Sequence, residues 1–218
     1  MEKDKLKTPI EYINEALSIY FKKENMIFFV KTMSIAVILS TILSFINSYY
    51  FSSSYSDYHP MMMVITFFST VIVLWVQVLA YFSVIDMGES EFEIMKKSFK
   101  NILRFFGISL VLGLIFFFGV LLLVVPGIIF GLWYSFVIFL VLDKNMKLKE
   151  AMRTSKALVK DKMMKVFGRL TVFSLFSFVA SILVSIIPFA GNIVLGLLSP
   201  LFLLPVYLLC KDLVGANN

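Results

Sequence analysis

The sequence predicts an all-α, polytopic membrane protein in which six transmembrane helices form three hairpins, each preceded by a cytoplasmic interfacial amphipathic helix. Three observations predict this class. First, 60% of the 218 residues are hydrophobic and only 16% are charged, which is more apolar surface than a water-soluble domain of this length buries. Second, the chain contains six long apolar windows. Third, all of its basic residues fall on one side of the membrane that these windows define.

The six apolar windows have about the length that a membrane requires. A helix rises about 1.5 Å per residue, so roughly 20 apolar residues cross the hydrocarbon layer of about 30 Å. The windows are residues 26–46, 62–85, 105–125, 127–142, 166–187 and 193–210. The fourth window is the shortest, so its boundaries follow least directly from the sequence.

Prolines mark the expected turns and one expected bend. Pro126 removes a backbone donor and Gly127 permits a left-handed conformation, so we expect the chain to reverse there between the third and fourth windows. Pro188 marks the reversal between the fifth and sixth windows in the same way. Pro200 and Pro205 lie inside the sixth window, where we expect a kinked helix.

The distribution of charge predicts the orientation. Short loops that are rich in Lys and Arg stay in the cytoplasm. Six basic residues lie at or before Lys31, four follow the second window, nine follow the fourth, and Lys211 follows the sixth. The loops of the opposite side carry no basic residue and a single acid, Asp57. This partition predicts a multi-pass protein of the cytoplasmic (plasma) membrane with cytoplasmic N and C termini, and the heavy use of Lys, Phe and Ile indicates a bacterial source.

Each hairpin follows a segment whose apolar residues form a stripe at helical spacing. In the first segment, Thr8 to Glu11 predict a capping box with proline at the first helical position. We therefore expect residues 1–25 to form a cytoplasmic amphipathic segment and residues 26–218 to form a single transmembrane domain of six helices. The stripes comprise Ile10, Ile13, Leu17, Tyr20 and Phe21; then Phe92, Met95, Phe99, Ile102, Leu103 and Phe106; and then Leu148, Met152, Ser155, Val159 and Met163.

Two of these segments also match in residue identity, which predicts an internal repeat of residues 86–142 and 143–210. Asp86 and Ser98 correspond to Asp143 and Ser155, 57 positions later, and Glu93, Met95 and Lys96 correspond to Glu150, Met152 and Arg153. Glu15 begins a weaker third copy. We expect Asp86 and Asp143 to cap the amphipathic helices that follow them. The expected structural motif residues are Asp86, Ser98, Pro126, Gly127, Asp143, Ser155, Pro188, Pro200 and Pro205.

The sequence contains few residues that suggest catalysis or metal binding. One cysteine, Cys210, and one histidine, His59, allow neither an intrachain disulfide nor a Cys/His zinc site. We find none of the motifs of nucleophilic, metal-dependent or nucleotide-binding enzymes. His59, with Asp57 nearby, could act on a lipid head group, but a solvated loop histidine is the simpler interpretation. We therefore predict no enzyme, no cofactor and no catalytic, cofactor-binding or metal-binding residue.

The basic stretch after the fourth window suggests a partner. Lys149, Arg153, Lys156 and Lys160 share one helical face and are the expected contacts with anionic lipid head groups. The bilayer accounts for the net charge of +6, so nucleic acid is not expected as a partner. A scaffold or membrane-homeostasis protein, with a membrane or cytosolic protein partner in addition to lipid, is the leading interpretation. A small permease or efflux component is the alternative, because broken helices occur at transport sites.

One stretch resembles a known family. It contains Pro126-Gly127-Ile128, Tyr134-Ser135-Phe136, Asp143, Glu150-Ala151, and Ser155 with Leu158-Val159-Lys160. It resembles the membrane domain found with bacterial glycerophosphoryl diester phosphodiesterases and the related uncharacterised six-span bacterial membrane proteins. The resemblance implies fold and location. In some relatives a soluble phosphodiesterase barrel follows and supplies the catalytic residues; because this sequence stops at Asn218, we expect no barrel and carry over no catalytic residue.

The six-window topology is testable by cysteine accessibility. On a Cys210→Ala background, single cysteines at Ser53, Lys97, Lys156 and Ala190 are probed on intact cells with an impermeant thiol reagent. We expect labelling at Ser53 and Ala190 alone, because the other two positions belong to the basic, cytoplasmic side. Labelling at Lys97 or Lys156 would contradict the charge argument and the repeat that depends on it.

Overall fold

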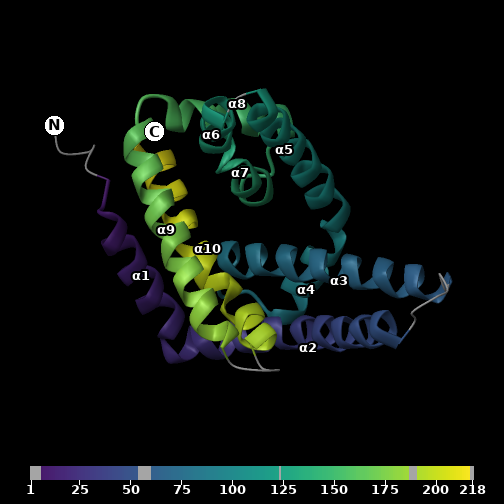
Figure 1. Ribbon diagram of the computed structural model, residues 1–218. Coiled ribbons are helices and arrows are strands. Elements are labelled where there is room, and N and C mark those ends of the chain that lie inside the picture. Colours follow the sequence, from purple (N-terminus) through teal and green to yellow (C-terminus); the bar gives the residue numbers. More distant parts are fainter. Residues whose placement is uncertain (1–5, 54–59, 123, 187–190, 217–218) are drawn as a thin grey trace. The chain divides into compact units, whose positions relative to one another are not determined.

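The computed structural model describes residues 6–53, 60–122, 124–186 and 191–216, and all of the regular secondary structure in these segments is helical (Figure 1). The all-α prediction is therefore confirmed. The helices are α1 Pro9–Phe21, α2 Lys23–Ser53, α3 Pro60–Ile85, α4 Glu91–Lys100, α5 Ile102–Leu122, α6 Val124–Tyr134, α7 Val137–Asp143, α8 Leu148–Lys160, α9 Met163–Ser185 and α10 Gly191–Ala216. Pro188, Asp57 and His59 lie outside the described residues.

Six segments of the described chain are long and apolar enough to cross a membrane, as predicted. They are Lys23–Tyr49, Met63–Ile85, Ile102–Leu121, Val125–Asp143, Met163–Ser185 and Gly191–Ala216. By helix length and hydropathy the chain is a multi-pass membrane protein. The fourth segment, at 19 residues, is longer than the window read from the sequence and consists of α6 and α7 in succession.

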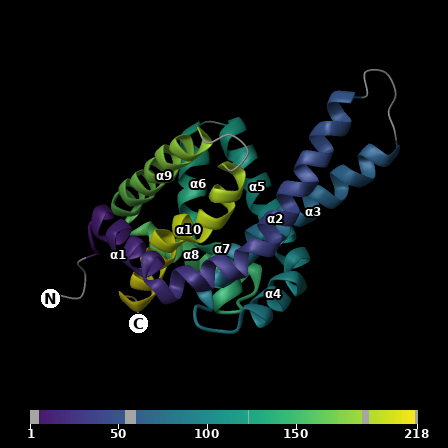
Figure 2. The same cartoon turned by 90° about the horizontal axis from the view of Figure 1, so that it is seen from below.

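The chain divides into two compact units. The first unit contains Met1–Lys22, Leu103–Ala180 and Leu201–Asn218, and the second contains Lys23–Ile102 and Ser181–Pro200. Helices α2 and α3 of the second unit lie side by side, and α4 lies near the N-terminal part of α2 and the C-terminal part of α3 (Figure 2).

The buried side chains of α2 and α3 in the second unit lie toward one end of each helix. Phe29 and Met33 in the N-terminal half of α2 are fully buried, as are Val78 and Leu79 in the C-terminal half of α3. The opposite halves of both helices expose large apolar side chains: Ile38, Ile42, Phe45 and Tyr49 in α2, and Met63, Val64, Phe67 and Phe68 in α3. Exposed apolar surface of this extent is typical of helices that face lipid.

The hairpin of α5 and α6 in the first unit corrects one prediction. Pro126 and Gly127 do not form the turn: they are the third and fourth residues of α6, where a missing backbone N–H is tolerated. Positive φ angles occur among the described residues only at Gly88 and Asn145, so Gly127 is not left-handed. Its role is close packing, because a Cβ atom there would lie 2.5 Å from Cγ2 of Val120 and 2.9 Å from the Val120 backbone nitrogen.

The two prolines of the sixth span lie within α10, which remains helical from Gly191 to Ala216. Pro200 has no N–H to offer the carbonyl of Gly196, four positions earlier. In the second unit the Ser199 hydroxyl donates to that carbonyl at 2.7 Å. Serine thus satisfies the acceptor that proline leaves free, which is how membrane helices tolerate proline. Gly196 also lets α10 approach α2, because a Cβ atom there would lie 2.7 Å from Cγ2 of Val37.

The close approach of α5 and α6 predicts the effect of a single methyl group. We expect Gly127→Ala to destabilise the protein by about 1–3 kcal/mol, because the new Cβ atom overlaps Val120 and its backbone. The midpoint of thermal unfolding in detergent measures the change. Gly113→Ala in α5 is the matched control: nothing lies within 4 Å of its added Cβ, so we expect no loss of stability. Equal effects of the two substitutions would contradict the packing role.

Candidate functional site

Three amphipathic helices, α1, α4 and α8, each join a transmembrane segment through a few buried side chains. These are Tyr12, Ala16 and Tyr20 of α1; Ile94 and Ser98 of α4; and Ala151, Ser155, Leu158 and Val159 of α8. Most of the lysines of α4 and α8 lie off these buried faces. The three helices and the residues that hold them are the candidate functional site.

Helix α1 begins as the sequence predicted. The Glu11 backbone N–H donates to Oγ1 of Thr8 at 3.3 Å, and the Thr8 backbone N–H donates to Oε2 of Glu11 at 2.7 Å. Pro9 occupies the first helical position. The capping box is therefore confirmed. It satisfies two backbone donors at the helix end and fixes where α1 starts.

In the first unit α1 is attached through Tyr12 and through the two residues that precede its N-cap. The fully buried Tyr12 donates its hydroxyl to Oδ2 of Asp212 in α10 at 2.7 Å, and its ring meets Phe173 of α9 edge-on. The Arg169 guanidinium donates to the backbone carbonyls of Leu6 and Lys7 at 2.6–3.0 Å. Burial raises the pKa of the Tyr12 phenol, and the Asp212 carboxylate raises it further, so Tyr12 stays a neutral donor.

In the second unit α4 is held by Ser98 and Lys97. The indole N–H of Trp75 in α3 donates to Oγ of the fully buried Ser98 at 2.9 Å. The Lys97 ammonium bonds Glu89 at 2.6 Å and Asp86 at 3.1 Å. The hydrogen bond to Glu89 raises the pKa of Lys97, and the bond to Asp86 adds to the shift.

The predicted capping role of Asp86 is wrong. The residue that caps α4 is Ser90, whose hydroxyl accepts the backbone N–H of Glu93. Asp86 instead forms an ion pair with Lys97 of α4, which links the two ends of the connection between α3 and α4. Gly88 in that connection has a positive φ of 100°. Asp143 does not cap α8 either: Lys147 occupies that position without a side-chain bond, and Asp143 lies 3.6 Å from the Lys144 ammonium.

In the first unit α8 is held by Ser155 at a break in the fourth span. Between α6 and α7, residues Ser135 and Phe136 leave the regular helix. The fully buried Ser155 hydroxyl donates to the Trp133 carbonyl at 2.7 Å and accepts the Phe136 backbone N–H at 3.4 Å. One side chain of α8 therefore satisfies the donor and the acceptor that the break exposes, which is required where water is excluded.

Ser98 and Ser155, which the predicted repeat aligns, both bond a tryptophan of a preceding helix. Ser98 accepts the indole N–H of Trp75, 23 positions earlier, and Ser155 donates to the backbone carbonyl of Trp133, 22 positions earlier. The residue after the serine also covers the ring: Phe99 meets Trp75 edge-on, and the Lys156 ammonium lies 3.9 Å from the Trp133 ring centre. Ser98 and Ser155 therefore each join an amphipathic helix to the preceding span, through a side-chain group in one case and backbone groups in the other.

The four basic residues that were expected to contact lipid are not equivalent. Lys149, Arg153 and Lys160 are exposed on the face of α8 opposite its buried residues, and none forms an ion pair with any described residue. Lys156 is half-buried and directs its ammonium at Trp133, which makes it part of the attachment of α8. Three basic side chains therefore remain available for an external anion.

Within the described segments, no three His, Cys, Asp or Glu side chains lie close enough to bind a metal ion. No family model, no curated protein and no solved structure matches this chain. Any assignment of function therefore depends on the geometry of the chain itself.

The residues that hold the amphipathic helices were only partly visible in the sequence. Ser98 and Ser155 were found through the repeat, but their partners Trp75 and Trp133 and the pair of Tyr12 and Asp212 were missed. One signal was available: the sequence contains only two tryptophans, and each precedes a repeat serine by nearly the same number of residues. No comparable signal connects Tyr12 with Asp212, which lies 200 positions later.

The break in the fourth span predicts a large effect for Ser155→Ala. This change leaves the Trp133 carbonyl and the Phe136 N–H without their partner in a buried setting, so we expect a loss of about 1–3 kcal/mol. The midpoint of unfolding by sodium dodecyl sulfate measures it. Thr154→Ala, at the neighbouring and partly exposed position of α8, is the control and should stay within about 0.5 kcal/mol of the unchanged protein. A neutral Ser155→Ala would show that the break does not depend on this hydroxyl.

Proposed function

We propose that this chain is a non-enzymatic integral membrane protein of the bacterial cytoplasmic membrane, with both termini in the cytoplasm, that works as a scaffold or in membrane homeostasis. One observation supports the proposal above the others. Each of the three amphipathic helices is held to a span by buried polar or aromatic side chains, and α8 keeps Lys149, Arg153 and Lys160 exposed and unpaired among the described residues.

Anionic lipid is the partner that this arrangement favours. Each Lys or Arg near an anionic leaflet adds about 1 kcal/mol of attraction. On α8 the buried face is attached to the protein, so the basic face is left for the head groups or for an acidic segment of a partner protein. The charge distribution of the sequence supports a cytoplasmic position for this face, because basic loops are retained there.

The proposal that the chain is not an enzyme draws on the same residues. Two of the four fully buried polar side chains of the described segments, Ser98 and Ser155, bond to a group of another helix and hold helices together. The resemblance to the membrane domain of glycerophosphoryl diester phosphodiesterases also supports a membrane role without catalytic groups in the spans. Hydrolysis of a lipid head group that is lost on His59→Ala would contradict the proposal.

A small permease or efflux component is the second candidate, and one observation favours it. The fourth span is interrupted between α6 and α7, and interrupted helices occur at transport sites. The backbone groups at this interruption are already bonded to Ser155, which favours a structural role for it. Loss of substrate flux on Pro200→Ala or Pro205→Ala, with expression retained, would favour the permease.

The contact of α8 with anionic lipid is tested by a label on its basic face. On a Cys210→Ala background, Ala157→Cys, an exposed position between Arg153 and Lys160, carries a polarity-sensitive fluorophore. We expect a blue shift of emission in phosphatidylglycerol nanodiscs relative to phosphatidylcholine nanodiscs, because the basic face draws α8 onto the anionic surface. Salt at about 0.5 M should reduce the shift by screening.

Two charge-matched variants distinguish the basic face from net charge. Lys149→Gln with Lys160→Gln should remove most of the shift, whereas Lys96→Gln with Lys100→Gln removes the same charge from α4 and should leave it unchanged. Equal emission in both lipids, or a shift that survives the α8 substitutions, would contradict lipid contact by α8.

A further inference from the structure

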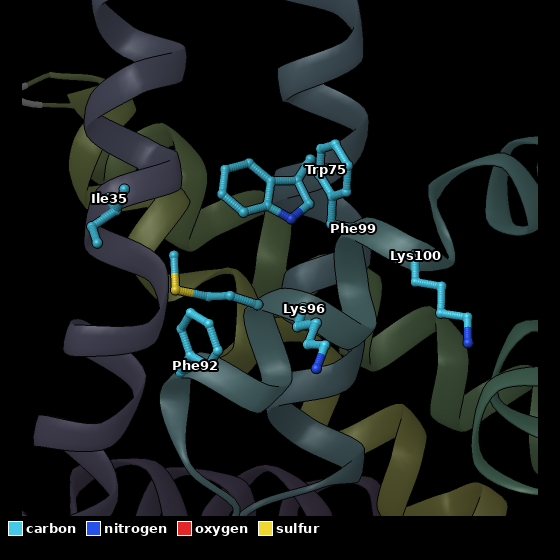
Figure 3. A pocket seen from close by; sticks show the side chains of 7 residues that line it. Ile35, Trp75, Phe92, Lys96, Phe99 and Lys100 are labelled. Atoms are coloured by element: carbon cyan, nitrogen blue, oxygen red, sulfur yellow. The ribbon is translucent and has the colours of Figure 1, made fainter.

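A pocket in the second unit lies between α2, α3 and α4. Its lining residues are Ile35, Trp75, Phe92, Met95, Lys96, Phe99 and Lys100, and its volume is about 750 Å³. Ligand pockets typically have volumes of roughly 300–1,000 Å³. Figure 3 shows the apolar side chains of Ile35, Trp75 and Phe92 around the pocket, with the lysine side chains extending from α4. The pocket is separate from the basic face of α8.

The aromatic side chains that α4 contributes to the pocket are exposed. Helix α4 attaches to the protein through Ile94 and Ser98, so its stripe of Phe92, Met95 and Phe99 faces elsewhere. Phe92 is 72% exposed and Phe99 is 67% exposed. Trp75 is fixed against this stripe by its bond to Ser98 and its edge contact with Phe99.

The charge of the pocket is entirely positive. Lys96 and Lys100 lie four positions apart on α4, so their stems leave the same side of the helix. Lys97 between them points away and pairs with both Asp86 and Glu89. Neither Lys96 nor Lys100 pairs with any acid among the described residues, and no acid lines the pocket. Two unpaired ammonium groups beside an apolar aromatic wall are complementary to an anion that carries a hydrocarbon chain.

We infer that this pocket binds one anionic phospholipid, with an acyl chain against Trp75, Phe92 and Phe99 and the phosphate between Lys96 and Lys100. The inference depends on the membrane location in the proposed function but not on lipid contact by α8. A free phosphate would leave the apolar wall in water, and a zwitterionic lipid offers the two ammonium groups no net charge. An anionic phospholipid satisfies both parts of the pocket at once.

The fluorescence of Trp75 can show which lipid lies in the pocket. The chain contains two tryptophans, so Trp133→Phe leaves Trp75 as the only indole. This variant is reconstituted as the full chain into vesicles that contain brominated phosphatidylglycerol in phosphatidylcholine, or the reverse. Bromine on the acyl chains quenches indole fluorescence at contact. We expect phosphatidylglycerol to be favoured at Trp75 by roughly 30-fold in relative binding constant, the combined contribution of Lys96 and Lys100.

Charge variants then show whether the pocket causes the preference. Lys96→Gln with Lys100→Gln should reduce it to about onefold, the value for no selection, and Lys96→Arg with Lys100→Arg should retain it. Lys149→Gln with Lys160→Gln removes equal charge from α8 and should not change it. If Trp133→Phe does not fold, the difference in quenching between the unchanged protein and Trp75→Phe gives the same quantity.

Three results would overturn the inference. They are equal quenching of Trp75 by the two lipids, a preference that survives Lys96→Gln with Lys100→Gln, and a preference that falls equally with the α8 substitutions. The last result would assign selectivity to net surface charge. Because the α8 label and Trp75 are read separately, loss of the α8 response with a retained Trp75 preference would contradict only the proposed role of α8.

Discussion

Hydrocarbon gives transmembrane helices little reason to associate, because lipid tails are as apolar as the side chains that a soluble protein would bury. The packing of this chain depends on what replaces that driving force. One replacement is close backbone approach, as at Gly127 against Val120 and Gly196 against Val37. The other is a small set of buried hydrogen bonds, of which the Ser155 bonds to Trp133 and Phe136 are the clearest. In such a setting an unmade hydrogen bond costs more than a lost methyl contact.

The amphipathic helices follow from the same constraint. They adjoin the ends of spans, and in the second unit Phe29 and Leu79, in the halves of α2 and α3 near α4, are fully buried while Phe45 and Phe67 of the same two helices are exposed. A helix that covers an apolar end must also satisfy the polar backbone groups near it. Ser155 does so directly at the break in the fourth span, and Ser98 receives the Trp75 indole at an unbroken one. The two serines that the sequence aligns thus satisfy different groups, a side-chain indole N–H at Ser98 and two backbone groups at Ser155.

The sequence predicted the features that depend on composition and on near neighbours. Six spans followed from apolar length, and the start of α1 followed from Thr8, Pro9 and Glu11, which lie within a single helical turn. It did not predict which atoms those residue types would meet. Asp86 was assigned to a helix cap because acids occur there, but its partner is Lys97, 11 positions later.

Gly127 shows the same limit for backbone conformation. A Pro-Gly pair is the usual sign of a turn, yet here the requirement for glycine arises from Val120 on the adjacent helix. That requirement exists only once α5 and α6 have approached each other. The pocket beside α4 could not be predicted from the sequence either. The direction in which Phe92 and Phe99 face depends on which side of α4 is held by Ile94 and Ser98.

The bond between Tyr12 and Asp212 has a consequence for synthesis. Its two residues are 200 positions apart, so at 5–20 residues per second the ribosome completes the partner roughly 10–40 s after Tyr12 emerges. Throughout this interval the Tyr12 hydroxyl lacks the carboxylate that it bonds in the folded protein, although Arg169 and Phe173 are made before Asp212. An amphipathic helix in that condition rests on the membrane surface. Helix α1 is therefore fully attached only after Asp212 of α10 has been made.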